Sequence, residues 1–486
     1  MAMKVMATTL AARAPVLAAG ALVLAAAALS AGYVFGTEVF MEPMATYERH
    51  VHSAGHRALF MCSAHFIARR KPEDIERWEL RYAAPDFIAP GRTELEPATM
   101  SAVGVTARGL IRRRAAYEEG RGCVLLSPGA GAESLLRLGT ARYGYRPEQG
   151  AAPWPRGDAP RLLNAVVDAA FDGRTYHQSD ASWMPDAKTI GLVIVHHGRI
   201  VAERYAEGWD EHTQYRAYSA SKSLSNLIAG ARVLEGKLSI DAPVLFPEWA
   251  DPDDPRRAIT TRHLLNMSSG LKCDGGGTFS LDTYFAGGRN AALDAAQRPL
   301  VARPGTKWCY SNYDSISVAR AVARTFVRQQ DFIAYAYELL RRIGMRDTVL
   351  ETDPYGNLII SSQIWTTPRD LARFGLLYLN DGICNGERVL PEGWVAFTRT
   401  PAPAPAHSMR ASSTQLPTGY GAQFWLYDDR TLLPEDTFTA AGHGGQFSTI
   451  VPSRSVVIAR LGLQGWKHKQ FVADVLNALP EGAGAP

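Results

Sequence analysis

Strand-like segments in this chain fall into two groups that lie far apart in the sequence. The first group is Ile190 to Val195 and Ile200 to Tyr205, joined by His197-Gly198, and it predicts a β-hairpin with a tight turn. The second group consists of Gln423 to Tyr427, Phe447 to Val451 and Val456 to Leu463. The region between the groups is mostly helical in pattern. This order predicts an α/β fold of the α+β type: an antiparallel β-sheet built from both ends of the region, flanked by helices, with an inserted helical subdomain.

Apolar residues at helical spacing predict the helices that flank this sheet. Residues 162–170 place Leu, Val and Ala on one face, and residues 471–479 form a second amphipathic segment. Thr367-Pro368 predicts a helix start, because threonine caps helices and proline favours their first turn. Leu371 to Leu379 continue that helix.

The chain has 486 residues, which is more than one ordinary domain needs. A Pro/Gly-rich break marks a boundary and contains Pro147, Gly150, Pro153 and Pro155. We therefore expect three parts: a membrane anchor or signal segment over 1–36, an extension of unclear fold over 37–155, and a domain over 156–486 that holds the sheet. The extension contains one helical segment, Glu73 to Leu80.

Residues 14–36 form an uncharged run rich in alanine, leucine and valine, long enough for a membrane helix of about 20 residues. Lys4 and Arg13 precede the run and Glu38 follows it, so the positive-inside rule places the rest of the chain outside the cytoplasm. The alternative is a signal peptide cleaved at Ala28-Leu29-Ser30. The first interpretation predicts a protein held at the bacterial inner membrane with its catalytic part in the periplasm or outside the cell, and the second predicts secretion.

Charge balance and cysteine content indicate which partners, cofactors and disulfides to expect. Lys plus Arg number 52 against 48 acidic residues, which gives no reason to expect nucleic acid as a partner. No CxxC or HExxH spacing occurs, so we expect neither a metal site nor another cofactor. The five cysteines fit an exported protein with disulfides. We expect the pairs Cys62–Cys123 and Cys273–Cys309, with Cys384 free.

Ser219-Ala220-Ser221-Lys222 precedes an apolar helical face that runs from Leu224 to Leu234 and stops near Gly236. Ser219 therefore lies near a helix N-terminus, with Lys222 one turn later on the same side. A serine hydroxyl needs a base to become a nucleophile, and a lysine whose pKa is lowered by burial can serve as that base. The S-x-x-K pattern also occurs at Ser269 to Lys272, where Gly270 and the glycines that follow indicate a loop.

Tyr310-Ser311-Asn312 lies between a Pro-Gly loop and a predicted helix over 316–326. A tyrosine hydroxyl there could relay a proton between Lys222, Ser219 and a leaving group. The Y-x-N triplet recurs at Tyr355 to Asn357, in a turn, and at Tyr378 to Asn380, at a helix end. Taken alone, Tyr310 is better explained as an ordinary loop tyrosine.

His443-Gly444-Gly445 leads into the strand that starts near Phe447. Paired glycines allow a substrate to approach the strand backbone closely, and the N–H of Gln446 could be an oxyanion donor beside that of Ser219. His196-His197-Gly198 matches the same H-x-G pattern, but it lies before Ser219 and forms the predicted hairpin turn. A plain strand-entry turn remains the alternative for His443.

The order of these three elements resembles the serine β-lactamase and penicillin-binding-protein family, which carries S-x-x-K, then Y-x-N, then K-T-G or H-x-G. Residues 259–271 and 370–375 are similar to it as well, and the resemblance covers about 155–480. It implies a β-lactamase-like serine hydrolase domain in which Ser219 is acylated, Lys222 is the base and Tyr310 relays protons. It also implies that Asn312, His443, Gly445 and Gln446 bind the substrate.

The third motif departs from that of β-lactamases, because His443 replaces lysine and Gly444 replaces a hydroxyl residue. Those groups bind a substrate carboxylate, so the change points to the branch with class C-like esterases of family VIII and 6-aminohexanoate-dimer hydrolases. We expect an exported hydrolase of a small ester, amide or peptide-like substrate. The alternatives are a penicillin-binding or sensor protein that is acylated with little turnover, and a scaffold without chemistry. An α/β-hydrolase is disfavoured because no G-x-S-x-G motif occurs.

Overall fold

The computed structural model describes residues 47–80, 89–138, 154–177, 188–273, 282–403, 419–427, 432–463 and 465–480. The predicted membrane or signal segment and most of the predicted domain boundary lie outside these ranges. Within them, no helix combines the length and the apolar character that crossing a membrane requires.

A seven-stranded antiparallel sheet forms the centre of the main domain, in the order β12-β13-β14-β15-β16-β5-β6. Its strands β16 and β5 come from opposite ends of the domain and pair from Val456 opposite His196 to Leu463 opposite Lys188. The predicted sheet built from both ends is therefore confirmed. The strands are β5 Lys188–His196, β6 Arg199–Tyr205, β12 Gly419–Tyr420, β13 Trp425–Leu426, β14 Phe438–Gly442, β15 Gln446–Val451 and β16 Val456–Leu463.

The turn that joins β5 and β6 is the predicted one. His197 and Gly198 both have left-handed backbones, with φ of 48° and 73°, as a tight hairpin turn between twisted strands requires. The predicted strand over 423–427 is shorter than expected. Gln423 has a φ of 64° and lies in the turn of the β12–β13 hairpin, so that strand begins only at Trp425.

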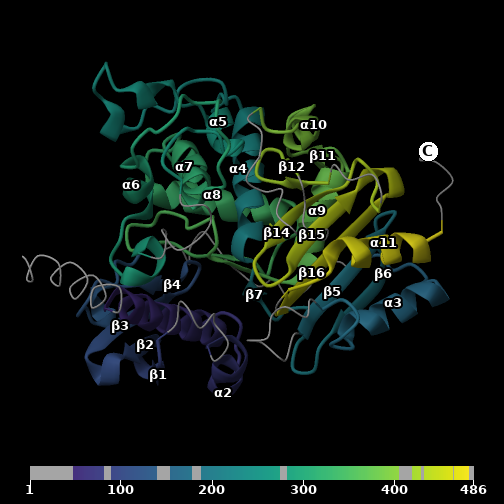
Figure 1. Ribbon diagram of the computed structural model, residues 1–486, viewed down its shortest axis with the longest axis horizontal. Helices are drawn as coiled ribbons and strands as arrows, with labels where there is room; N and C mark the ends of the chain where they lie inside the picture. The colour runs from purple at the N-terminus through teal and green to yellow at the C-terminus, as the bar shows by residue number, and fades with distance from the viewer. Residues whose placement is uncertain are drawn as a thin grey trace, which may run out of the picture.

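Helices cover both faces of this sheet (Figure 1). Helix α9, Pro368–Leu379, packs on β5, β15 and β16, and its predicted cap is confirmed because the Thr367 hydroxyl accepts the Asp370 N–H. Helices α3, Arg161–Phe171, and α11, His468–Ala478, lie together on the opposite face. Both were expected from their apolar spacing, and their buried side chains share one core cluster with the sheet.

The inserted helical subdomain lies beside the sheet in Figure 1. Its helices are α4 Lys222–Leu234, α5 Thr261–Leu265, α6 Ala291–Ala296, α7 Asn312–Ala323 and α8 Gln329–Arg342, and a π-helical segment, η10, spans Asp282–Ala286. A three-stranded sheet, in the order β7-β9-β8, connects this subdomain to the rest. Its strands are β7 Tyr215–Arg216, β8 Val349–Leu350 and β9 Ile364–Thr366; the remaining short elements are β10 Ile383–Cys384, β11 Glu387–Arg388 and α10 Trp394–Arg399.

The extension folds as a helix over residues 47–66 packed on a four-stranded antiparallel sheet, β1-β2-β3-β4. The predicted helical segment after Pro72 is present as α2, Pro72–Ile75, and η1, Glu76–Leu80. The expected disulfide Cys62–Cys123 joins the long helix to β4. The strands, which sequence patterns did not predict, are β1 Gly91–Glu96, β2 Ser101–Thr106, β3 Ile111–Glu118 and β4 Gly122–Leu125.

One hydrophobic cluster runs through the extension and the main domain. It contains Phe60 and Leu125 from the extension together with Phe285, Ile316 and Trp365 from the main domain. The Phe60 ring lies 5.9 Å from the Trp365 ring, centroid to centroid. The extension therefore shares a hydrophobic core with the main domain and is not a separately packed unit.

Candidate active site

Ser219 lies in a 3₁₀ turn, Tyr218–Ser221, that continues directly into α4. The residue before it, Tyr218, has a left-handed backbone with a φ of 48°, which a bulky side chain rarely adopts. Its ring is held in place by the Arg216 guanidinium at 4.6 Å and by the His443 ring at 5.4 Å. The predicted position of Ser219 at a helix start is confirmed, and the strained turn holds this serine at the partly exposed end of a buried helix.

Lys222 is the first residue of α4, and it is only 1% exposed. Its Nζ atom lies 3.1 Å from Ser219 Oγ, 2.6 Å from Asn312 Oδ1 and 2.7 Å from the backbone oxygen of Ser361. Asn312 begins α7, whose N-cap is Ser311. These three acceptors of the buried amine, a hydroxyl, a side-chain amide and a backbone carbonyl, are all uncharged.

Tyr310 precedes α7 and faces the same amine. Its ring centroid lies 4.9 Å from Lys222 Nζ. The ring stacks on Trp425 at 5.1 Å and meets Tyr420 edge to face at 5.8 Å, so aromatic packing fixes its orientation. The expected disulfide Cys273–Cys309 attaches the residue just before Tyr310 to a distant loop. The structure therefore brings Ser219 and Lys222 from one segment together with Tyr310 and Asn312 from a second segment about 90 positions away.

The His443-Gly444-Gly445 segment forms the turn between β14 and β15. Gly444 and Gly445 have φ values of 77° and 83°, which only glycine adopts without strain. At the end of β14, a Cβ on Gly442 would lie 2.1 Å from the backbone oxygen of Ala217. This close approach places the turn against the segment that leads into Ser219.

Gln446 and Arg460 hold that turn from behind. The Gln446 amide donates to the backbone oxygens of His443 at 2.9 Å and Gly462 at 2.6 Å, and the Arg460 guanidinium donates to Gly445 O at 2.6 Å. Gln446 is 0% exposed. Its side chain therefore stabilises the turn, and the oxyanion role predicted for its N–H stays a prediction.

His443 lies at the exposed edge of the turn, with its ring against Tyr218. Although one side of the residue meets solvent, desolvation by the surrounding protein and, second, the positive charge of Arg216 lower its pKa. The imidazole is therefore neutral at pH 7. A neutral imidazole is a weaker ligand for a substrate carboxylate than the lysine found at this position in β-lactamases.

The competing motifs lie in other surroundings. Ser269 is in a loop and donates to Asp314 Oδ1 at 2.8 Å, while Tyr378 is buried and donates to Asn226 Oδ1 at 2.7 Å. Tyr355 lies in an exposed turn, and His197 forms the β5–β6 hairpin turn. These surroundings agree with the interpretation of each residue as part of a loop, a turn or a helix end.

Sequence reasoning missed two groups that shape the site: the backbone oxygen of Ser361 and the buried Arg216, whose Nε donates to Ser362 O at 2.9 Å. No motif marks either residue, because a backbone acceptor can be carried by any amino acid. Over the part of the chain that the structure describes, no cluster of three His, Cys, Asp or Glu side chains could hold a metal ion.

Comparison with known proteins gives consistent results. A family model described as Beta-lactamase matches residues 178–463. A 6-aminohexanoate-dimer hydrolase of Paenarthrobacter ureafaciens is 24% identical over 304 residues, which cover 56% of this chain and 72% of that protein. An uncharacterized protein of Alkalihalophilus pseudofirmus is 24% identical over 324 residues, covering 61% of this chain and 90% of that one. Among solved structures, a Bacillus anthracis protein proposed to be a 6-aminohexanoate-dimer hydrolase shares the fold with a TM-score of 0.50 and 20% identity, covering 69% of this chain and 87% of that chain.

Proposed function

Because this chain belongs to the beta-lactamase family and is a serine hydrolase of that family, we propose that it cleaves an ester or amide through an acyl-enzyme on Ser219. The observation that carries the proposal is the 3.1 Å distance between Lys222 Nζ and Ser219 Oγ inside a buried site. A nucleophile and its base must lie within hydrogen-bond reach for the proton to transfer.

The acceptors at Lys222 carry no charge. Its Nζ donates to Ser219 Oγ, Asn312 Oδ1 and Ser361 O, and none of these oxygens favours the ammonium form as a carboxylate would. For the reaction we propose that the amine is neutral, so that its lone pair takes the place of the N–H that faces the Ser219 hydroxyl. In the proposed first step the Ser219 proton passes to Lys222 while Oγ bonds to the substrate carbonyl carbon.

Tyr310 completes the proposed proton path. In the collapse of the tetrahedral intermediate, the bond to the leaving alcohol or amine breaks, and the proton held by Lys222 reaches that group through the Tyr310 hydroxyl. Water then attacks the acyl carbonyl carbon while the base takes one of its protons. The bond between that carbon and Ser219 Oγ breaks, the proton passes from the base to Oγ, and the acid product leaves. The Tyr310 ring centre lies 4.9 Å from the Lys222 amine, and this proximity supports the proposal.

The substrate is proposed to be a small ester or amide without a carboxylate at the position that β-lactams use. His443 in place of lysine, its lowered pKa and the absence of a side-chain hydroxyl at Gly444 support this. Similarity to a 6-aminohexanoate-dimer hydrolase supports linear amides as candidates. Asn312 and the His443 to Gln446 turn are proposed to orient the substrate.

We also propose that the catalytic part works outside the cytoplasm, attached through residues 14–36 or secreted after their removal. The disulfides Cys62–Cys123 and Cys273–Cys309 support this location, because such bonds persist in oxidising compartments. Fractionation of cells that express the full chain, combined with protease accessibility, tests it. A catalytic domain that stays protected from protease in intact spheroplasts would contradict this location.

The test of the activity is labelling with a fluorophosphonate probe, which reacts with activated serines. Wild-type protein is expected to label, Ser219→Ala to lose labelling, and Ser269→Ala to label normally because it alters the other S-x-x-K serine. A hydrolysis panel of nitrocefin, p-nitrophenyl esters, D-amino acid amides and linear amide oligomers then sorts the substrate. A stoichiometric burst without steady turnover on every substrate would identify an acylated sensor instead.

A further inference from the structure

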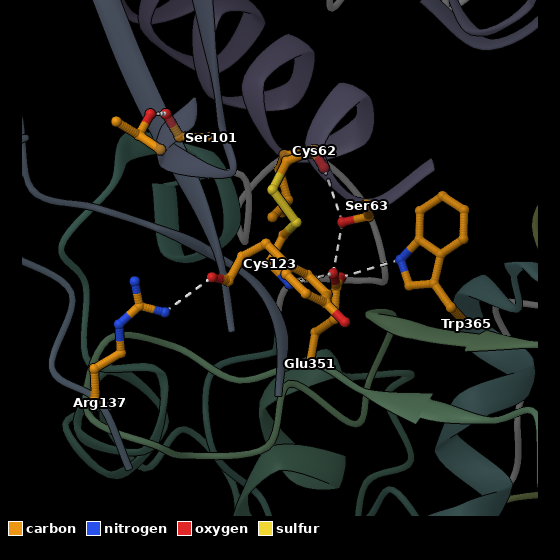
Figure 2. The surroundings of a disulfide bond; sticks show 10 residues. Cys62, Ser63, Ser101, Cys123, Arg137, Glu351 and Trp365 are labelled. Carbon is orange, nitrogen blue, oxygen red and sulfur yellow. Dashed lines mark hydrogen bonds between the residues drawn. A yellow bond between two sulfur atoms is a disulfide. The ribbon is translucent and has the colours of Figure 1, made fainter. Parts of the chain in front are cut away.

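Glu351 is a buried carboxylate where the extension meets the main domain, and it is 1% exposed. Its Oε1 accepts hydrogen bonds from Ser63 Oγ at 2.5 Å and from the Cys123 N–H at 3.0 Å, and its Oε2 accepts the Trp365 indole N–H at 3.1 Å. Figure 2 shows these groups converging beside the Cys62–Cys123 disulfide. Ser63 follows Cys62 in the chain, so the disulfide holds Ser63 close to Cys123. Both residues donate hydrogen bonds to the same carboxylate oxygen.

The backbone of Glu351 fixes a short loop that reaches the site. Its N–H donates to Gln363 O at 3.1 Å, and its carbonyl accepts the Ile359 N–H at 3.1 Å. The Gln363 N–H in turn donates to Ile359 O at 2.9 Å and closes the loop. Ser361 lies in the middle of this loop, and its backbone oxygen is the acceptor 2.7 Å from Lys222 Nζ.

A side chain from η10 braces the same loop. The Tyr284 hydroxyl lies 2.6 Å from Ser361 Oγ, and Tyr284 and Glu351 line one small pocket. On the other side, the Ala217 N–H donates to Ile364 O at 2.8 Å, which joins the strand after the loop to the segment before Ser219. Movement of Glu351 would therefore displace the supports of both Lys222 and Ser219.

A buried carboxylate is an expensive way to join two parts of a protein. Taking such a group out of water costs several kcal/mol unless every lone pair is bonded, and apolar side chains such as Phe60 and Phe285 pack at this junction. Apolar packing joins parts but leaves loops free to slide, whereas hydrogen bonds fix direction. The carboxylate is thus suited to holding a loop in one position.

We propose that Glu351 is a positioning residue for the active site: Ser63 and Cys123 of the extension hold it, and it fixes the loop whose Ser361 oxygen locates the Lys222 amine against Ser219. The inference rests on the proposed function of Ser219 and Lys222. It assigns the extension a part in catalysis, since two of the three groups that hold the carboxylate belong to it.

The test is the rate at which a fluorophosphonate labels Ser219 at pH 8, where the Glu351 carboxyl is mainly ionised, in full-length wild type, Glu351→Gln and matched controls. A glutamine amide must direct its NH₂ at either the Cys123 N–H or the Trp365 indole N–H, so one pair of donors is opposed. We expect the labelling rate constant to fall about tenfold or more, with the labelled fraction at completion unchanged and the KM of an ester substrate altered less than about twofold. The double variant Glu351→Gln/Trp365→Phe removes an opposed donor and is expected to recover part of the rate.

Asp370→Asn is the matched control. Asp370 is also fully buried, but its carboxylate accepts from Asp347 N–H and Thr348 Oγ1 instead of supporting the loop before β9. We expect it to lower the melting temperature without changing the labelling rate of the folded protein. Ser63→Ala removes only the hydroxyl from the extension and is expected to slow labelling about threefold, so the proposal stays testable if Glu351→Gln does not fold.

The outcomes separate the two proposals. Wild-type protein that does not label at Ser219 overturns the proposed function. Wild type that labels while folded Glu351→Gln and Ser63→Ala label at the wild-type rate overturns the positioning role alone. Equal slowing by Asp370→Asn also overturns it, because the effect would then follow from any loss of a buried carboxylate.

Discussion

The Asn312 Oδ1 atom lies 2.6 Å from Lys222 Nζ, so the first residue of α7 contacts the first residue of α4 across the site. An amide at this distance accepts a hydrogen bond without adding charge. An acidic side chain there would instead favour the ammonium form of the lysine. An amide rather than a carboxylate at this position is therefore what the proposed lysine base requires.

Asn312→Asp tests that requirement. The new carboxylate is expected to keep Lys222 protonated, so activity at pH 7 should fall about 10- to 100-fold and recover as the pH is raised. The measurement is the pH dependence of kcat/KM for wild type and variant on one ester. A variant whose acid limb stays where the wild-type limb lies would exclude Lys222 as the base.

Arg460→Met is expected to loosen the turn beside Tyr218. The substitution removes the bond to Gly445 O but keeps an apolar side chain beside Trp466, whose ring centroid lies 3.7 Å from the Arg460 guanidinium carbon. We expect KM to rise about fivefold, because a positioned contact to substrate is lost, while the melting temperature changes by only a few degrees. Arg204→Met, an exposed arginine on the edge strand β6, is the control and should leave KM unchanged.

The stability of the protein is expected to depend on pH through Glu351. Burial raises the pKa of Glu351 from 4.5 to about 7, against the hydrogen bonds and the Arg216 charge that lower it. Tyr284, Arg289 and Asp353 also line its pocket. Between pH 4.5 and 7 the folded protein keeps a proton that the unfolded chain releases, so the free energy of unfolding falls as the pH rises and levels off above 7.

Urea unfolding at pH 5 and pH 8 measures this contribution. Relative to Glu351→Gln, wild type should lose about 3 kcal/mol over that interval, the value that a pKa difference of this size implies. Other buried acids, such as Asp370, are present in both proteins and cancel in the comparison. A wild-type protein that gains stability relative to the variant over the same interval would contradict the prediction.

The two disulfides are expected to differ in their effect on catalysis. Each closes a loop, of 61 residues for Cys62–Cys123 and 36 for Cys273–Cys309, and each should stabilise the fold by about 2–4 kcal/mol. The first also holds Ser63 and Cys123 against Glu351. Cys62→Ala/Cys123→Ala should therefore slow labelling of Ser219, and adding Glu351→Gln should slow it little further. Full additivity of the two effects would show that the disulfide and the carboxylate act independently.

Local patterns in the sequence were sufficient to predict much of the secondary structure of the main domain. The Thr367-Pro368 helix start, the His197-Gly198 turn and the placement of Ser219 and Lys222 on successive turns follow from caps, turn conformations and helical spacing. All three depend only on residues close together in the chain. These features can therefore be predicted without knowing which residues pack against them.

The extension could not be read in the same way. Strand β3 contains three consecutive arginines, Arg112 to Arg114, which show no alternation of apolar and polar residues, and two of them pair with glutamates across the sheet. In the main domain, strand β14 was not predicted either. It is short and consists mostly of small residues, so apolar and polar residues do not alternate clearly along it. The contact between Ser63 and Glu351 spans 288 positions, and Ser361 acts through its backbone. Neither leaves a pattern in neighbouring residues.

The cluster that contains Phe60, Phe285 and Trp365 has a practical consequence for anyone who handles the gene. Cutting the coding region down to its recognisable portion, a common first step toward a crystallisable enzyme, would remove part of the interior and leave aromatic faces open to water. Such a fragment is expected to precipitate or to be recovered inactive. The segment that must be expressed for the domain to fold is therefore longer than residues 178–463, the segment that matches the family model.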